Sequence, residues 1–166
     1  MRYFRTSLIV LTVLLAALSA LGQATAFTDA SVEYTFQIPE EKWKAVNSGG
    51  NPEFVYGYRN EGHFDIRKVS SPRNTPWADL IREQEDKLQF LQSYVAGKQE
   101  NFNGKLNGAV FNYEFVKSGR PMSGRIYFLR SGDTVYLLRF TGYQDSLRSL
   151  RAQTDTIGRT FEIKGG

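Results

Sequence analysis

The chain has 166 residues, no cysteine and one histidine, and its 21 Lys+Arg against 17 Asp+Glu give a formal net charge of +4. These numbers exclude disulfides, thiolate metal sites, a cysteine nucleophile and any site that needs two histidines. Aromatic residues make up 14% of the sequence, which is typical of a packed globular protein and not of a disordered chain.

The first 26 residues have the pattern of a secretory signal peptide. Two arginines precede the apolar run Leu8–Leu21, and Ala24–Ala26 supplies small residues before a cleavage point. A retained membrane anchor is the alternative, but a 14-residue helix rises only about 21 Å, less than the roughly 30 Å of a bilayer core. We therefore predict a secreted or periplasmic protein with no membrane span after cleavage, and a single domain at 27–166.

The first predicted strand is Val32–Ile38, where apolar and polar residues alternate with period two. Pro39 ends it, because proline cannot donate a hydrogen bond to a neighbouring strand. Residues 40–45 are predicted as a short turn that places Trp43 against the sheet.

A hairpin is predicted from two alternating segments, Phe54–Arg59 and His63–Val69. A three-residue turn between them would place Tyr58 opposite Phe64. One face of this hairpin would be apolar and the other mostly polar.

A long helix is predicted from Thr75, as N-cap, and Pro76, as first helical residue, to Val95. Gly97 is expected just past its end. The apolar positions follow the 3.6-residue period of a helix with one buried face. Those expected to be buried are Trp77, Leu80, Ile81, Leu88 and Leu91.

Three strands and a last helix complete the predicted order: Ala109–Lys117, Gly124–Arg130, Thr134–Thr141 and a helix near Asp145–Gly158. The last two strands are apolar on both sides, so both faces of the sheet need to be covered. We therefore predict an α+β fold, a three-layer α/β/α sandwich in which helices cover both faces of a mainly antiparallel sheet.

Several motifs occur in a recognisable order along these elements. They are Tyr34–Pro39 followed by Trp43, the turn Asn107-Gly108, the strand start Gly124-Arg125 and the strand Tyr136–Thr141. In these features the chain resembles the PsbP/Mog-like family, which includes the PsbP subunit of photosystem II, a fungal Ran-binding protein and many exported bacterial domains. The resemblance implies the fold of that family and a non-enzymatic role in binding or assembly. It implies neither photosynthetic nor nuclear function.

Positive charge is concentrated in the last third of the chain. Residues 27–116 carry a net charge of −3 and residues 117–166 a net charge of +5, mostly from arginine. The total of +2 is too small for a general nucleic-acid binder. Because arginine binds carboxylate and phosphate groups bidentately, we expect a protein partner or an anionic envelope component. The candidate binding residues are Arg125, Arg139, Arg148 and Arg151.

The four arginines fall into two pairs. A three-residue turn at 131–133 would set Arg125 opposite Arg139, which requires an anion or an internal carboxylate such as Glu114 between them. The other two, Arg148 and Arg151, lie off the apolar stripe of the last helix and are expected to reach solvent.

His63 and Asp65 share one side of the predicted hairpin and are weak candidates for metal ligands, because two ligands do not complete a site. No G-x-S-x-G motif surrounds any serine. We therefore expect no cofactor and an exported, non-catalytic binding or assembly module of the cell envelope. A small hydrolase or metal-dependent enzyme with its site on the 54–69 hairpin is the alternative.

The signal peptide gives a direct prediction for the exported protein. We expect its first residue to be Phe27, because Ala24–Ala26 matches the small residues required before the cleavage point. N-terminal sequencing of the exported form measures this. A membrane-bound protein that still begins at Met1 would contradict it.

Overall fold

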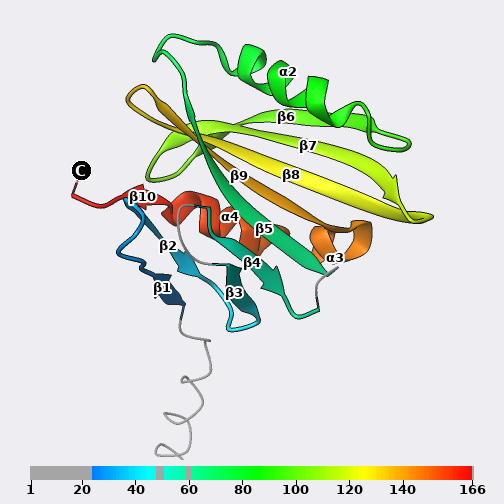
Figure 1. The fold of residues 1–166 in the computed structure, drawn as a ribbon, viewed down its shortest axis with the longest axis horizontal. Coiled ribbons are helices and arrows are strands. Elements are labelled where there is room, and N and C mark those ends of the chain that lie inside the picture. Colours follow the sequence, from blue (N-terminus) through cyan, green and yellow to red (C-terminus); the bar gives the residue numbers. More distant parts are fainter. Residues whose placement is uncertain (1–23, 48–50, 59–60, 166) are drawn as a thin grey trace, which may run out of the picture.

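A computed structural model describes residues 24–47, 51–58 and 61–165 (Figure 1). The apolar run of the predicted signal peptide lies outside these residues. Among the residues described, no helix is long and apolar enough to cross a bilayer.

Seven strands form the main sheet, in the order β3-β4-β5-β9-β8-β7-β6, and every neighbouring pair is antiparallel. The strands are β3 (Trp43–Asn47), β4 (Glu53–Tyr56), β5 (Gly62–Ser70), β6 (Val95–Asn103), β7 (Asn107–Lys117), β8 (Arg120–Ser131) and β9 (Thr134–Tyr143). A smaller sheet has the order β1-β2-β10 and consists of β1 (Thr25–Phe27), β2 (Tyr34–Ile38) and β10 (Glu162–Ile163).

The two faces of the main sheet contact separate hydrophobic clusters, because successive strand residues point to opposite sides. One cluster includes α2 (Trp77–Leu88), and the other includes residues of β2, α3 (Gln144–Ser149) and α4 (Arg151–Thr160). In Figure 1, α2 lies above the main sheet and the smaller sheet lies below it with α3 and α4. The predicted α+β class and mainly antiparallel sheet are confirmed. The predicted layering omitted the smaller sheet.

The predicted hydrophobic positions are largely correct. The buried ones include Leu80, Ile81, Leu88, Phe128, Tyr136 and Leu138. Trp77 and Leu91 are partly buried and pack at the margin of the α2 cluster. Leu91 lies just beyond the end of the helix at Leu88.

The first predicted strand occurs as β2, but it belongs to the smaller sheet. Its neighbour β1 contains Thr25 and Ala26, which signal cleavage after Ala26 would remove. Phe27 would remain, with its ring centroid 4.8 Å from that of Phe36 and 5.2 Å from that of Phe54. The predicted first residue of the exported protein is therefore also the residue that attaches this segment to the core.

The predicted end of the long helix is wrong. The helix ends at Leu88, a turn follows in which Ser93 has φ of 53°, and Val95 begins β6. Gly97 lies where the register of β6 against β7 shifts. A Cβ atom there would be 2.6 Å from the backbone oxygen of Asn112, so the residue is a glycine because the two backbones approach closely.

The predicted hairpin exists with a different register. Phe54 pairs with Phe64 and Tyr56 with Gly62, so the strands separate at Gly57, whose φ is 58°. Tyr58, expected in the apolar face, is 83% exposed. Phe54 and Phe64 are buried as expected, because the turn is longer by an even number of residues and leaves the faces unchanged.

We expect Leu138→Ala to lower the free energy of unfolding by about 2–5 kcal/mol, because this side chain is completely buried between β2 and the main sheet. Urea denaturation measures the change. Val46→Ala is the control, since Val46 is mostly exposed and its truncation should cost less than about 0.5 kcal/mol. Equal costs for the two variants would contradict burial of Leu138.

Candidate functional site

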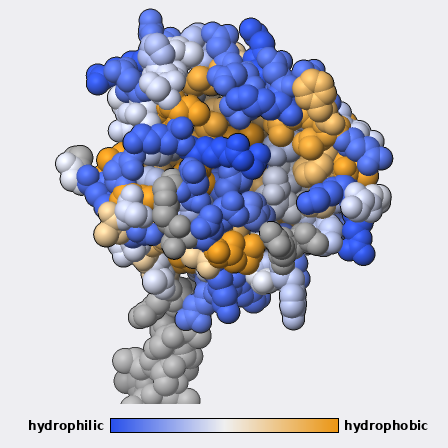
Figure 2. Space-filling model, in the orientation of Figure 1, coloured by the Kyte–Doolittle hydropathy of each residue, from blue (hydrophilic) through white to orange (hydrophobic). Residues whose placement is uncertain are grey.

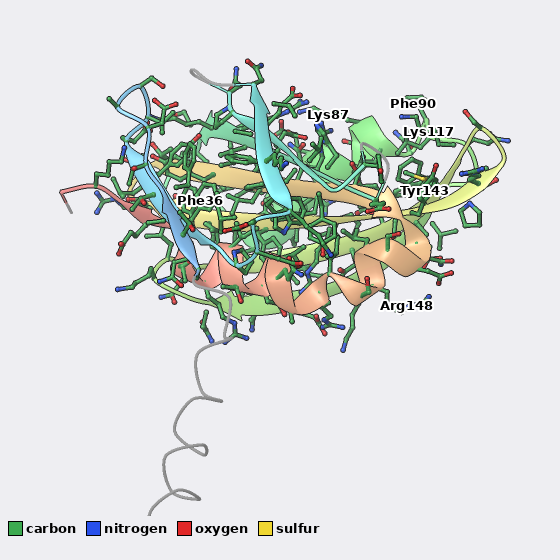
Figure 3. All side chains as sticks on the ribbon, turned by 90° about the horizontal axis from the view of Figure 1, so that it is seen from below. Phe36, Lys87, Phe90, Lys117, Tyr143 and Arg148 are labelled. Atoms are coloured by element: carbon green, nitrogen blue, oxygen red, sulfur yellow. The ribbon has the colours of Figure 1, made fainter. Side chains whose placement is uncertain are left out.

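A groove of about 490 Å³ lies between the start of the last helical region and the β6–β7–β8 part of the main sheet. Three of the four candidate arginines line it: Arg125 from β8, Arg148 from α3 and Arg151 from α4. Lys98 of β6 lines the opposite side. We call this hollow the arginine groove. Figure 3 shows Arg148 at the α3 end, pointing outward.

The exposed cations of the arginine groove are held by weak ion pairs. The side chains of Arg148, Arg151 and Lys98 are 69%, 62% and 78% exposed. Arg148 contacts Asp145 at 3.2 Å, whereas Arg151 and Lys98 share the single carboxylate of Glu100 at 3.5 and 3.1 Å. Exposed ion pairs contribute about 0–1 kcal/mol each, so these cations can exchange their carboxylates for a ligand at little cost.

Arg125 has a different role, because its side chain is only 8% exposed and its donors are occupied inside the protein. Nε donates to the Tyr127 hydroxyl at 2.6 Å, Nη1 to Asn112 Oδ1 at 2.7 Å and Nη2 to Asp155 Oδ1 at 2.9 Å. The Tyr127 hydroxyl in turn donates to Asp155 at 2.6 Å. Burial raises the pKa of Tyr127 above its usual range, which keeps the hydroxyl protonated as a donor. Arg125 therefore attaches α4 to the sheet.

Arg139 lies outside the arginine groove, on the other face of the main sheet. Its Nε and Nη2 atoms both lie 2.9 Å from Asp65 Oδ2. The prediction that it stands opposite Arg125 is wrong: Arg125 pairs with Phe140, and Arg139 pairs with Ile126. The turn between β8 and β9 has two residues and not three, which shifts the register by one and sends the two side chains to opposite faces.

The internal carboxylates are also different from the one expected. Asp155 contacts Arg125 and Asp65 contacts Arg139, whereas Glu114 is exposed on β7. Each arginine thus has an acid on its own side of the sheet. The expectation of an internal partner is correct, but the named residue is not.

His63 and Asp65 do lie on one side of β5, with His63 Nδ1 and Asp65 Oδ2 4.0 Å apart. The two oxygens of Asp65 are already contacted by Arg67 and Arg139, so a metal cation there would face two guanidinium groups. His63 Nε2 lies 3.4 Å from Glu53. In the part of the chain that the structure describes, no group of three or more His, Cys, Asp or Glu side chains could hold a metal ion.

Lys98 and Glu100 were not predicted, because β6 was interpreted as the end of a helix and a loop. A signal was present in the sequence. Asn103-Gly104 and Asn107-Gly108 mark a turn before the strand at Ala109, and a hairpin turn requires a strand on each side. That requirement indicates a strand ending at Asn103, where β6 ends.

The chain matches no known family model, and no curated protein matches it in sequence. Solved structures do match. Cyanobacterial PsbP (CyanoP) from Synechocystis sp. PCC 6803 has a TM-score of 0.59 at 13% identity, over 87% of this chain and 95% of that one. The Saccharomyces cerevisiae Ran-binding protein Mog1p has a TM-score of 0.64 at 8% identity, over 86% and 96%.

Two further matches come from other bacteria. LpqN of Mycobacterium tuberculosis, a protein involved in cell envelope biogenesis, has a TM-score of 0.58 at 14% identity, over 86% of this chain and 91% of that one. A Bacteroides thetaiotaomicron protein matches with a TM-score of 0.59 at 17% identity, over 86% of this chain. The match spans about half of that protein, 49% of its length. The fold is therefore PsbP/Mog-like, as the sequence motifs indicated.

We expect Arg125→Gln to lower the free energy of unfolding by about 2–3 kcal/mol, because Asp155 would keep its charge in a half-buried place without the guanidinium. Chemical denaturation measures this. The exposed Arg120, which donates to the Tyr143 hydroxyl, provides the control: Arg120→Gln should cost less than about 0.5 kcal/mol. The double variant Arg125→Gln with Asp155→Asn should cost less than the sum of the single variants. Strict additivity would contradict a coupled pair.

Proposed function

We propose that this chain is an exported, non-catalytic binding module of the cell envelope, and that its arginine groove holds an anionic envelope component or an acidic patch of a protein partner. One observation carries the proposal. Arg148, Arg151 and Lys98 come from three different elements and line one groove, with most of each side chain in solvent.

The charge distribution supports an anionic ligand. Arg148 and Arg151 belong to the region 117–166, which has a net charge of +5. Two of the groove cations, Arg151 and Lys98, share the single carboxylate of Glu100, while Glu114 is an acid among the residues that line the groove. Arginine offers two parallel N–H donors to a carboxylate or phosphate, which favours a ligand with such groups over a neutral one.

The location of the module follows from the predicted signal peptide and is consistent with one structural match. LpqN is involved in cell envelope biogenesis, and Mog1p is a Ran-binding protein. These descriptions suit a scaffold that works by binding. In this proposal the three-layer α/β/α arrangement serves as a rigid frame, and the arginine groove lies where α3 and α4 meet the sheet margin.

The alternative of an enzyme on the 54–69 hairpin has less support. Both oxygens of Asp65 are contacted by arginines, and His63 faces Glu53 across 3.4 Å. Such a cluster neutralises charge on a sheet face. It does not supply the metal ligands that the alternative requires.

The test is affinity capture from the native envelope fraction with the exported protein and with a variant carrying Arg148→Glu and Arg151→Glu. We expect recovery of the partner to fall by about tenfold or more in the variant, because each substitution replaces attraction by repulsion. Recovery with the parent protein should also fall from low to high salt.

The matched control carries Arg82→Glu and Arg73→Glu. Arg82 pairs with Asp79 three residues away, as Arg148 does with Asp145, and both control arginines are exposed. Recovery with the control should stay close to that of the parent. Unchanged recovery with the groove variant, together with no salt dependence of the parent, would refute the arginine groove as the binding site.

A further inference from the structure

A second hollow lies on the opposite face of the main sheet, between α2 and the strands. It encloses about 320 Å³ and adjoins another of about 460 Å³, with Arg67, Gln84 and Lys87 lining both. Each volume is within the range of small-molecule sites, about 300–1,000 Å³. We call the two together the α2 cleft. The smaller hollow is lined by residues that include Lys87, Leu88, Leu91, Phe115, Ile126 and Arg139.

The apolar part of the α2 cleft exists because the helix is shorter than the strands beneath it. The helix ends at Leu88, and β7 and β8 continue past this end (Figure 1). Leu91 and Phe115 are consequently only half-buried, next to the fully covered Ile126. Figure 2 shows hydrophobic surface flanked by hydrophilic residues in the upper half of the molecule, where α2 lies above the sheet.

The polar part of the cleft is lined by four cations, Arg67, Lys68, Lys87 and Arg139, and two acids, Glu53 and Asp65. The two lysines pair with Glu33 and Glu83, which do not line the cleft. Asp65 Oδ1 lies 3.1 Å from Arg67 Nε, and Asp65 Oδ2 lies 2.9 Å from Arg139 Nε and Nη2. One carboxylate, itself only 8% exposed, therefore serves two guanidinium groups. A guanidinium has five N–H donors, so both arginines have the capacity to bind a second anion.

Apolar surface thus adjoins two guanidinium groups that share one carboxylate. We propose that the α2 cleft binds a small amphiphile with one carboxylate. Its hydrocarbon chain lies over Leu91 and Phe115, above the buried Ile126, and its carboxylate accepts hydrogen bonds from Arg67 and Arg139. A single carboxylate suits this place because Arg67 and Arg139 share one carboxylate, Asp65, and have further N–H donors. This site is on the other side of the sheet from the arginine groove and does not depend on the function proposed for it.

The test uses decanoate as the probe, titrated into the exported protein below its micelle concentration and followed by calorimetry. We expect one saturable site. Decanol lacks the charge and propanoate lacks most of the chain, so each should bind at least about tenfold more weakly. Equal binding of decanol and decanoate would overturn the role of the arginines, and equal binding of propanoate would overturn the role of the apolar surface.

Two rim variants locate the site. Arg67→Gln and Leu91→Ser should each weaken decanoate binding by about tenfold, since one removes a charged donor and the other an apolar contact. Arg82→Gln is the matched control, because Arg82 is exposed, is also paired with an aspartate and lines neither the α2 cleft nor the arginine groove. It should leave binding unchanged.

Amide NMR shifts of the parent protein give a measurement that needs no variant. Decanoate should shift the amide signals of Ile126 and Arg139 and leave those of Arg148 and Arg151 in place. Shifts confined to the arginine groove, or affinity lost equally in the Arg82→Gln control, would overturn the proposal.

Discussion

The register between β8 and β9 determines which side chains reach each of the two hydrophobic clusters. These two strands are in the middle of the main sheet, and each has apolar side chains on both sides. The two-residue turn Gly132-Asp133 fixes their register, and Gly132 adopts the positive φ of 61° that such a turn needs. A turn longer by one residue would direct one strand's core side chains to the wrong cluster, so this connection positions both halves of the core at once.

The same register separates the two arginines of these strands and gives each its own carboxylate. Burying a guanidinium without a partner is costly, because the lost hydration is not replaced. Arg125 meets Asp155 on the side of α4, and Arg139 meets Asp65 on the side of α2. Both acids come from elements distant in sequence from their arginine. The charge pairs therefore connect β8 to the last helix and β9 to β5, in addition to the hydrophobic contacts.

Elements that show a hydrophobic period were predicted correctly from the sequence. Predictions that depended on the exact length of one turn were wrong. The core faces of β2, β8, β9 and α2 were correct, since apolar alternation and the 3.6-residue period record burial directly. Strand β6 was missed because its side chains are almost all exposed at the edge of the sheet, so it has no apolar alternation. The predicted registers of two hairpins were wrong. The residues next to each turn also suit a strand, so the composition does not show how many residues the turn contains. The groove residues Arg148 and Arg151 were found from charge, whereas Lys98 depended on the missed strand.

The arginine groove and the α2 cleft lie where the packed core does not cover the sheet. Under α2 and against β2, side chains must fill a closed space, and hydrophobic residues of similar volume can replace one another there. This freedom explains how CyanoP and Mog1p share the fold at 13% and 8% identity. Past the end of α2 and beside α3, no such demand acts, so core packing does not determine the residues there. A common fold therefore carries no ligand from one of these proteins to another. For this chain any ligand has to be inferred from its own surface cations: the exposed Arg148 and Arg151 on one face, and the exposed Arg67 and partly buried Arg139 on the other.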